Sequence, residues 1–152
     1  MSFTKQLIAN FVASSLATWA DFDGASEEEN FELESRIGLS LPPVFWDYLR
    51  HMGWRSANFH IGSDTLFGCL HDLTDECREV MDGEGIEFPA DAFVFFAHQG
   101  YDYLYFRASE GDVTHSYTVF SSEMPTPVGI LSVSLIIFAL SLVPPVRVWL
   151  CQ

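Results

Sequence analysis

Two runs of apolar and aromatic residues, separated by a short polar break, constrain the fold of this chain more than any other segment. The runs cover residues 93–97 and 101–107, and the tripeptide His-Gln-Gly lies between them. Runs rich in Phe, Tyr and Val on either side of a glycine-containing gap predict a β-hairpin. Alternation along the second run places Tyr101, Tyr103 and Tyr105 on one face of their strand. This segment therefore predicts an antiparallel sheet.

Helical periodicity before this hairpin predicts three helices. Apolar residues recur at helical spacing over residues 7–20, and polar interruptions there argue against a secretory signal peptide. A second helix begins with Ser26 and Glu29, whose spacing fits a capping box, and it ends at Gly38. A third helix follows a pair of prolines and spans residues 44–52. We expect the first helix to be amphipathic and the protein to be cytoplasmic.

The remaining elements complete an α+β order. A loop is expected at residues 21–24, short strands within residues 57–67, a polar helix at residues 71–82 and a strand at about residues 113–120. Strands that follow one another without helical crossovers form antiparallel sheets. The sequence therefore predicts an α+β fold, with a largely antiparallel sheet and helices packed beside it. Without an internal repeat or linker, residues 1–152 are expected to form a single domain.

The C-terminal segment carries no charge between residues 124 and 146. Its almost wholly apolar core, residues 128–143, is shorter than the ~20 residues that a membrane-spanning helix needs. Prolines bracket this core on both sides. We therefore expect a buried helix at about residues 130–142 and no association with a membrane.

Acidic residues outnumber basic residues by 21 to 7, so the net charge is −14. Such a charge repels nucleic-acid phosphates and anionic lipid surfaces, and it favours basic partners. The acids concentrate in residues 21–34 and in residues 72–91. The candidate partner-binding acids are those of the predicted polar helix: Asp72, Asp75, Glu76, Glu79 and Asp82. The alternative for either block is an ordinary solvated surface that keeps an aromatic-rich protein soluble.

The tyrosine face of the hairpin is a second candidate contact surface. If helices cover only one side of the sheet, Tyr101, Tyr103 and Tyr105 lie on the other side and provide interface anchors. The alternative is that the C-terminal apolar helix or a second subunit covers these rings. A homodimer is therefore left open.

Cysteine and histidine patterns predict neither a metal site nor a cofactor. Cys69, Cys77 and Cys151 form no CxxC pair, and the histidines are scattered. Free thiols of this kind are typical of a reducing compartment, and no four-ligand zinc pattern is present in the sequence.

An enzyme is the weaker alternative. The candidate catalytic residues would be His98 or His115 as base, an Asp at position 102 or 112, and Ser116 or a cysteine as nucleophile. None of these residues falls in a nucleophile elbow, an HExxH motif or a phosphate-binding loop. We therefore expect no catalytic residues.

Two elements in sequence carry a family resemblance. Glu34 and Gly38 lead into Leu-Pro-Pro-Val-Phe at residues 41–45, a Leu-Pro-x-x-aromatic helix start. Residues 98–107 then precede a Gly-Asp turn and a strand. Over roughly residues 27–120 this order resembles the SUKH superfamily, the Smi/Knr-like proteins. The uncharged C-terminus departs from the family, whose members usually end in an amphipathic helix with acidic residues.

The resemblance implies a mixed or antiparallel sheet with helices beside it and no catalytic residues. Bacterial members are mostly immunity proteins, which bind and neutralise a cognate toxin, often a nuclease or deaminase domain. Fungal members regulate cell-wall synthesis. The expected function is therefore that of a non-catalytic immunity protein that binds a cognate protein toxin. The alternative is an intracellular regulatory or scaffold protein without a toxin partner.

Overall fold

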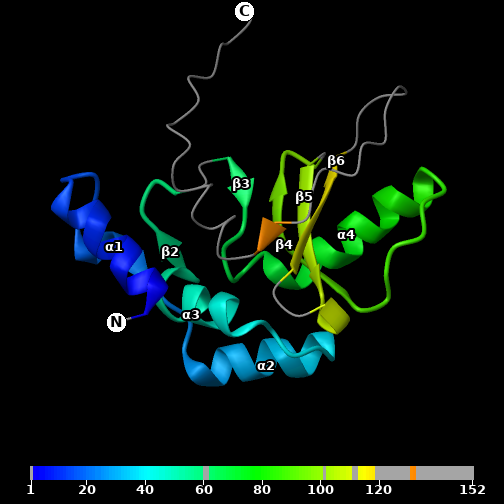
Figure 1. Cartoon of the computed structure of the whole chain (residues 1–152). Coiled ribbons are helices and arrows are strands. Elements are labelled where there is room, and N and C mark those ends of the chain that lie inside the picture. Colours follow the sequence, from blue (N-terminus) through cyan, green and yellow to red (C-terminus); the bar gives the residue numbers. More distant parts are fainter. Residues whose placement is uncertain (1, 60–61, 101, 111–112, 119–130, 133–152) are drawn as a thin grey trace, which may run out of the picture.

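The computed structural model describes residues 2–59, 62–100, 102–110, 113–118 and 131–132 (Figure 1). It has an α+β fold. The four α-helices of the described part are α1 (Phe3–Ala13), α2 (Glu27–Ile37), α3 (Pro43–Met52) and α4 (Leu70–Gly83). Within these residues no helix has both the length and the apolar character needed to cross a membrane.

α1 ends well before the predicted boundary at residue 20. Ser14 and Ser15 follow its last residue, and Ser15 has a positive φ of 59° that breaks the helical path. Serine side chains compete for backbone hydrogen bonds, so they favour helix ends over helix interiors. Leu16 and Trp19 belong to the predicted apolar face, but they are 66% and 58% exposed.

The predicted boundaries of α2 and α3 are confirmed. The Glu29 N–H donates to Ser26 Oγ at 3.2 Å, and the Ser26 N–H donates to Glu29 Oε2 at 2.8 Å, which is the predicted capping box. Gly38 ends α2 in the left-handed region with φ 70°. α3 begins at Pro43 and is followed by Gly53.

The main sheet has the order β3-β4-β5-β6-β7, and all neighbouring strands are antiparallel. Its strands are β3 (Ser63–Asp64), β4 (Ala92–His98), β5 (Asp102–Arg107), β6 (Val113–Thr118) and β7 (Leu131–Ser132). The β4–β5 pair is the predicted hairpin, and Gln99 and Gly100 in its turn both have positive φ. The predicted helix at residues 130–142 lies outside the described residues except for Leu131 and Ser132. These two residues pair with β6 as a strand, so the prediction of a helix is wrong at Leu131 and Ser132.

A second, two-stranded sheet joins the loop before α2 to the segment after α3. It pairs β1 (Phe22–Asp23) with β2 (Arg55–Ser56), so the predicted plain loop at residues 21–24 is wrong. Short antiparallel pairs of this kind depend on contacts between distant segments, which local sequence patterns do not reveal.

Helices cover both faces of the main sheet. On one face the Phe45 ring of α3 packs against Phe93, Phe95 and Phe106 at centroid distances of 5.5–6.0 Å. On the other face α4 packs against β4, where the Val94 N–H donates to Thr74 Oγ1 at 3.0 Å. Residues 92–97 of β4 are consequently all buried. In Figure 1, α2 forms the outer edge beneath α3, and α1 and α4 lie at opposite ends of the molecule.

Candidate partner-binding surface

The exposed side of α4 gathers the predicted acids. The buried positions of this helix are Leu70, Leu73, Cys77 and Met81, which pack toward the sheet. The exposed positions follow the complementary helical spacing i, i+3, i+4, i+7 and i+10. They are Asp72, Asp75, Glu76, Glu79 and Asp82, which we call the α4 acidic stripe. The structure thus places all five predicted residues on one solvent-facing surface.

Little of the charge in the α4 acidic stripe is neutralised. Asp75 forms an ion pair with Arg78, and Asp72 Oδ2 lies 3.0 Å from His71 Nε2. Glu76, Glu79 and Asp82 form no ion pair within the described residues. The stripe therefore presents a concentrated negative field to solvent.

The α4 acidic stripe disfavours the helix that carries it. Glu79 and Asp82 lie in the last two turns of α4, where the helix dipole is negative, and the last turn contains no basic residue. Acidic neighbours three and four residues apart also repel one another, at about 0.2–0.5 kcal/mol per pair. Only Asp72, in the first turn, is favourably placed relative to the dipole. Stability of α4 alone therefore does not explain the acids.

The other acidic block, residues 21–34, is largely committed to internal contacts. Glu29 caps α2 and also accepts from Trp54 Nε1 at 3.2 Å. Glu34 Oε1 accepts the Leu41 N–H at 2.6 Å, and Glu27 pairs with Arg50 at 3.0 Å. The hydroxyl and the N–H of Thr18 both donate to Asp21 and lower the pKa of its carboxyl. This block holds α2 and its flanking segments in place, so we favour α4 as the contact surface.

The tyrosines do not form the exposed surface that was predicted. Tyr103 is only 2% exposed, because α4 covers the face of the sheet on which it lies. Tyr105 is half-buried and its ring lies 5.8 Å from that of Phe88. Burial raises the pKa of both phenols. The expectation that Tyr103 lies on an exposed face is therefore wrong, and Tyr101 lies outside the described residues.

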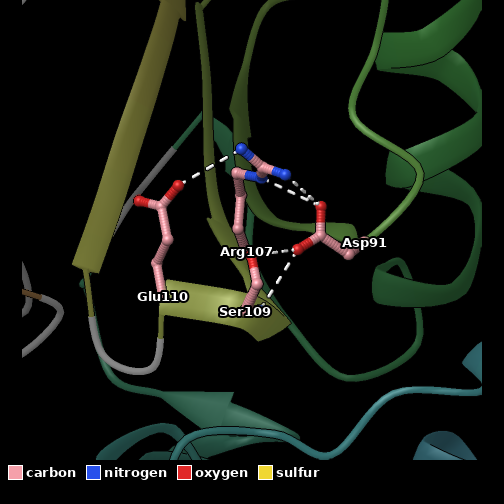
Figure 2. A network of polar contacts seen from close by, with 4 residues as sticks. All are labelled: Asp91, Arg107, Ser109 and Glu110. Atoms are coloured by element: carbon pink, nitrogen blue, oxygen red, sulfur yellow. Dashed lines mark hydrogen bonds and ion pairs between the residues drawn. The ribbon is translucent and has the colours of Figure 1, made fainter.

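A polar network at the other end of the hairpin was not predicted (Figure 2). Arg107 lies between two carboxylates: its Nε and Nη2 donate to Asp91 Oδ1 at 2.9 and 2.8 Å, and its Nη1 lies 3.2 Å from Glu110 Oε1. Asp91 Oδ2 also accepts from the hydroxyl and the N–H of Ser109. Hydrogen bonds from Ser109 and from Arg107 hold the pKa of Asp91 well below its usual range. This network fastens the segment before β4 to the end of β5.

The residues considered for catalysis are not assembled into a catalytic unit. Ser63 Oγ lies 2.8 Å from His98 Nδ1 across the β3–β4 pair, a contact that the sequence did not reveal. Asp102 is the cross-strand neighbour of His98, but its side chain forms no hydrogen bond or ion pair within the described part of the chain. The contact between Ser63 and His98 ties the short β3 to β4. Asp112 and the side chains of His115 and Ser116 lie outside the described residues.

The described cysteines are protonated thiols at neutral pH. Burial raises the pKa of Cys77 to about 12. Desolvation and the negative charges of Asp64, Glu76 and Asp72 raise the pKa of Cys69, which lies on the surface just before α4. No group of three or more metal-binding side chains occurs among the described residues, and Cys151 lies outside them.

Comparisons with known proteins find no match: no family model, no curated protein and no solved structure aligns with this chain.

Proposed function

We propose that this chain is a cytoplasmic, non-catalytic immunity protein that binds and neutralises a cognate protein toxin. The toxin would present a basic surface, as nuclease and deaminase domains do when they hold phosphate groups. The observation that carries the proposal is the α4 acidic stripe, five exposed acids on one face of a helix that is firmly packed through its other face. The sequence resemblance to the SUKH superfamily supports the same proposal.

The negative charge of the α4 acidic stripe would allow it to inhibit the toxin directly. An active site that binds phosphates must be electropositive, so carboxylates on a rigid helix compete for the same groups. Complementary fields also steer the two proteins together and raise the association rate. A net charge of −14 extends this attraction beyond the contact itself.

The unfavourable placement of these acids adds an independent argument. Residues that lower the stability of their own helix are expected where activity needs them. Glu79 and Asp82 at the end of α4 meet this description. Acids needed only for solubility are placed at less cost near a helix N-terminus, as in α2.

The first test is affinity capture of the chain from its native cells at low salt, with mass-spectrometric identification of what it retains. The expected product is a basic domain that stops growth when expressed alone and does not do so when co-expressed with this chain. Capture of a non-toxic signalling or cell-envelope protein would instead support the regulatory alternative. If no captured domain is toxic, the immunity role is wrong.

The second test neutralises the α4 acidic stripe. A variant carrying Asp72→Asn, Asp75→Asn, Glu76→Gln and Glu79→Gln is expected to bind the captured domain about fourfold to several hundredfold more weakly, because each interfacial charge contributes about 0.2–1 kcal/mol. Its affinity should also depend less on salt. The same variant should be more stable than the wild type, by about 1 kcal/mol, since repulsion within α4 is relieved.

A matched control carries Glu28→Gln and Glu32→Gln on the exposed side of α2. It removes charge of the same kind at a distance from α4, and its affinity should stay close to that of the wild type. Equal losses of affinity in the two variants would show that net charge alone governs binding. Unchanged affinity and salt dependence in the α4 variant would exclude the stripe.

A further inference from the structure

α1 is attached to the rest of the molecule through few buried side chains. Of its 11 residues only Thr4, Leu7 and Ile8 are buried. It packs mainly against α3 at one end of the molecule, and the ring of Phe11 also lies 4.6 Å from that of Phe59 (Figure 1). Isolated helices shorter than about 12–15 residues are marginal in water, so α1 needs these contacts to stay helical. We therefore expect the docking and the folding of α1 to occur together.

The start of α1 lacks the negative charge that stabilises a helix N-terminus. Its first turn contains no acidic residue, and Lys5 places a positive charge there. The helix dipole makes this arrangement unfavourable. Ser2 caps the N–H of Lys5 at 3.4 Å and leaves the N–H of Thr4 without an acceptor from α1 itself. The sequence of α1 alone therefore does not complete its N-terminus.

Asp47 of α3 supplies both the missing acceptor and the missing charge. Its Oδ2 accepts the N–H of Thr4 at 3.0 Å, although the two residues are 43 positions apart in the chain. On the α3 side, Oδ1 lies 3.5 Å from His51 Nδ1. Burial alone would raise the pKa of Asp47, but hydrogen bonds from Thr4 and Ser2 bring it below its usual value, so the carboxyl is ionised at neutral pH. One side chain thus joins the two helices and offsets the dipole of α1.

The segment that follows α1 can act as a hinge. Ser15 leaves the helical path with a φ of 59°, and residues 13–16 and 18–20 are all exposed. Segments with few buried contacts open at a lower free-energy cost than the core does. The end of α1 that lies away from Asp47 therefore does little to hold the helix in place.

We propose that α1 is a hinged arm that Asp47 latches to α3, and that this arm opens as a unit while α2, α3, α4 and the main sheet stay folded. Opening breaks the hydrogen bond between Asp47 and Thr4 and brings the apolar side chains of Leu7 and Ile8 to the surface. The chain can therefore expose an apolar surface reversibly without unfolding. Because α4 lies at the opposite end of the molecule, the α4 acidic stripe is the same in both forms (Figure 1).

Hydrogen exchange of the full chain, measured by mass spectrometry of peptic fragments, tests this directly. In the wild type the amides of α1 should exchange faster than those of β4 and α4, because α1 opens without the core. Asp47→Ala should raise the exchange rate in α1 by about a further fivefold, the usual effect of losing one helix cap, and leave the rates in α4 and β4 unchanged. Asp47→Asn keeps an acceptor and loses only the charge, so its effect on α1 should be about twofold.

Ser26→Ala provides the control, because it removes a side-chain cap from α2 rather than from α1. In this variant exchange in α1 should match that of the wild type. Unchanged exchange in α1 of Asp47→Ala would overturn the proposal, because Asp47 would then not hold the helix. An Asp47→Ala protein in which every element exchanges faster by the same factor would also overturn it, since α1 would then open only when the whole chain unfolds.

Discussion

Asn30 is a fully buried residue of α2, and neither Oδ1 nor Nδ2 of its side-chain amide has a hydrogen-bond partner among the residues that the structure describes. Burying an unpaired polar group of this kind costs about 1–3 kcal/mol. Leucine has nearly the same shape and needs no partner. We therefore expect Asn30→Leu to raise the free energy of unfolding by about 1–3 kcal/mol in urea denaturation.

Asn30→Ala serves as the control for this prediction. It also removes the unpaired amide, but it leaves a cavity, so its gain should be smaller than that of Asn30→Leu or absent. A loss of stability in Asn30→Leu would show that the amide is satisfied in the native state.

We expect Asp91 to influence how the free energy of unfolding decreases at acidic pH. Its pKa is lowered in the folded protein from a usual value of 3.8 by Ser109 and Arg107. The stabilisation is therefore complete above pH 3.8 and is lost as the pH falls through the lowered pKa. Asp91→Asn should be less stable than the wild type at neutral pH, and its stability should fall less steeply in acid.

Urea unfolding at a series of pH values measures this difference. Ser109→Ala is an informative companion, because it removes the largest cause of the shift and leaves the Arg107 pair in place. The decrease in its free energy of unfolding at acidic pH should be intermediate between those of the wild type and Asp91→Asn. Parallel curves for all three proteins would contradict the role assigned to Asp91.

At the scale of elements, Gly24 marks a close crossing between the segment before α2 and the end of α3. A Cβ atom at this position would lie 1.9 Å from the carbonyl oxygen of Arg50, a backbone atom that cannot rotate away. The neighbouring Ala25 N–H donates to the Leu49 oxygen at 2.8 Å, which fixes the approach. Gly24→Ala should therefore destabilise the protein by about 3 kcal/mol or prevent it from folding.

Gly83→Ala tests the same substitution where space is open. Apart from the chain neighbours of Gly83 and the backbone of its own helix, no atom of the described residues lies within 4 Å of the Cβ position at Gly83, the last residue of α4. Because alanine favours helix, this variant should be slightly more stable, by about 0.5–1 kcal/mol. Thermal unfolding of the two variants gives the comparison, and similar melting temperatures would contradict the close crossing at Gly24.

The elements that the sequence predicted well are those with local signals. The capping box of Ser26 and Glu29, the glycine at the end of α2 and the turn of the hairpin all depend on residues close together in the chain. The α4 acidic stripe was also predictable, since helical spacing alone places its acids on one face. Features that depend on distant segments were missed. Periodicity places Tyr103 on a face of β5, but only tertiary packing determines that α4 covers it.

At the scale of the whole molecule, the charge of −14 should make stability depend on ionic strength. Like charges repel across the folded surface, and salt screens that repulsion over a Debye length of about 8–10 Å. We expect NaCl to raise the free energy of unfolding by about 1 kcal/mol, or the melting temperature by ~2–4 °C. Differential scanning calorimetry measures the shift.

In the variant with a neutralised α4 acidic stripe, NaCl should raise the free energy of unfolding less than in the wild type, because part of the repulsion between like charges has been removed. A melting temperature that falls with NaCl would mean that surface ion pairs such as Glu27–Arg50 outweigh the net repulsion.

The division of α4 into a buried and an exposed side has a consequence for how such a protein diversifies. Leu70, Leu73, Cys77 and Met81 hold the helix against the sheet, while the five acids are exposed and their only ion-pair partners among the described residues are His71 and Arg78 of the same helix. Surface substitutions away from packing usually change stability by less than about 0.5 kcal/mol. Residues on the exposed side of α4 can therefore be substituted one at a time at little cost in stability, while the buried side continues to hold the helix against the sheet.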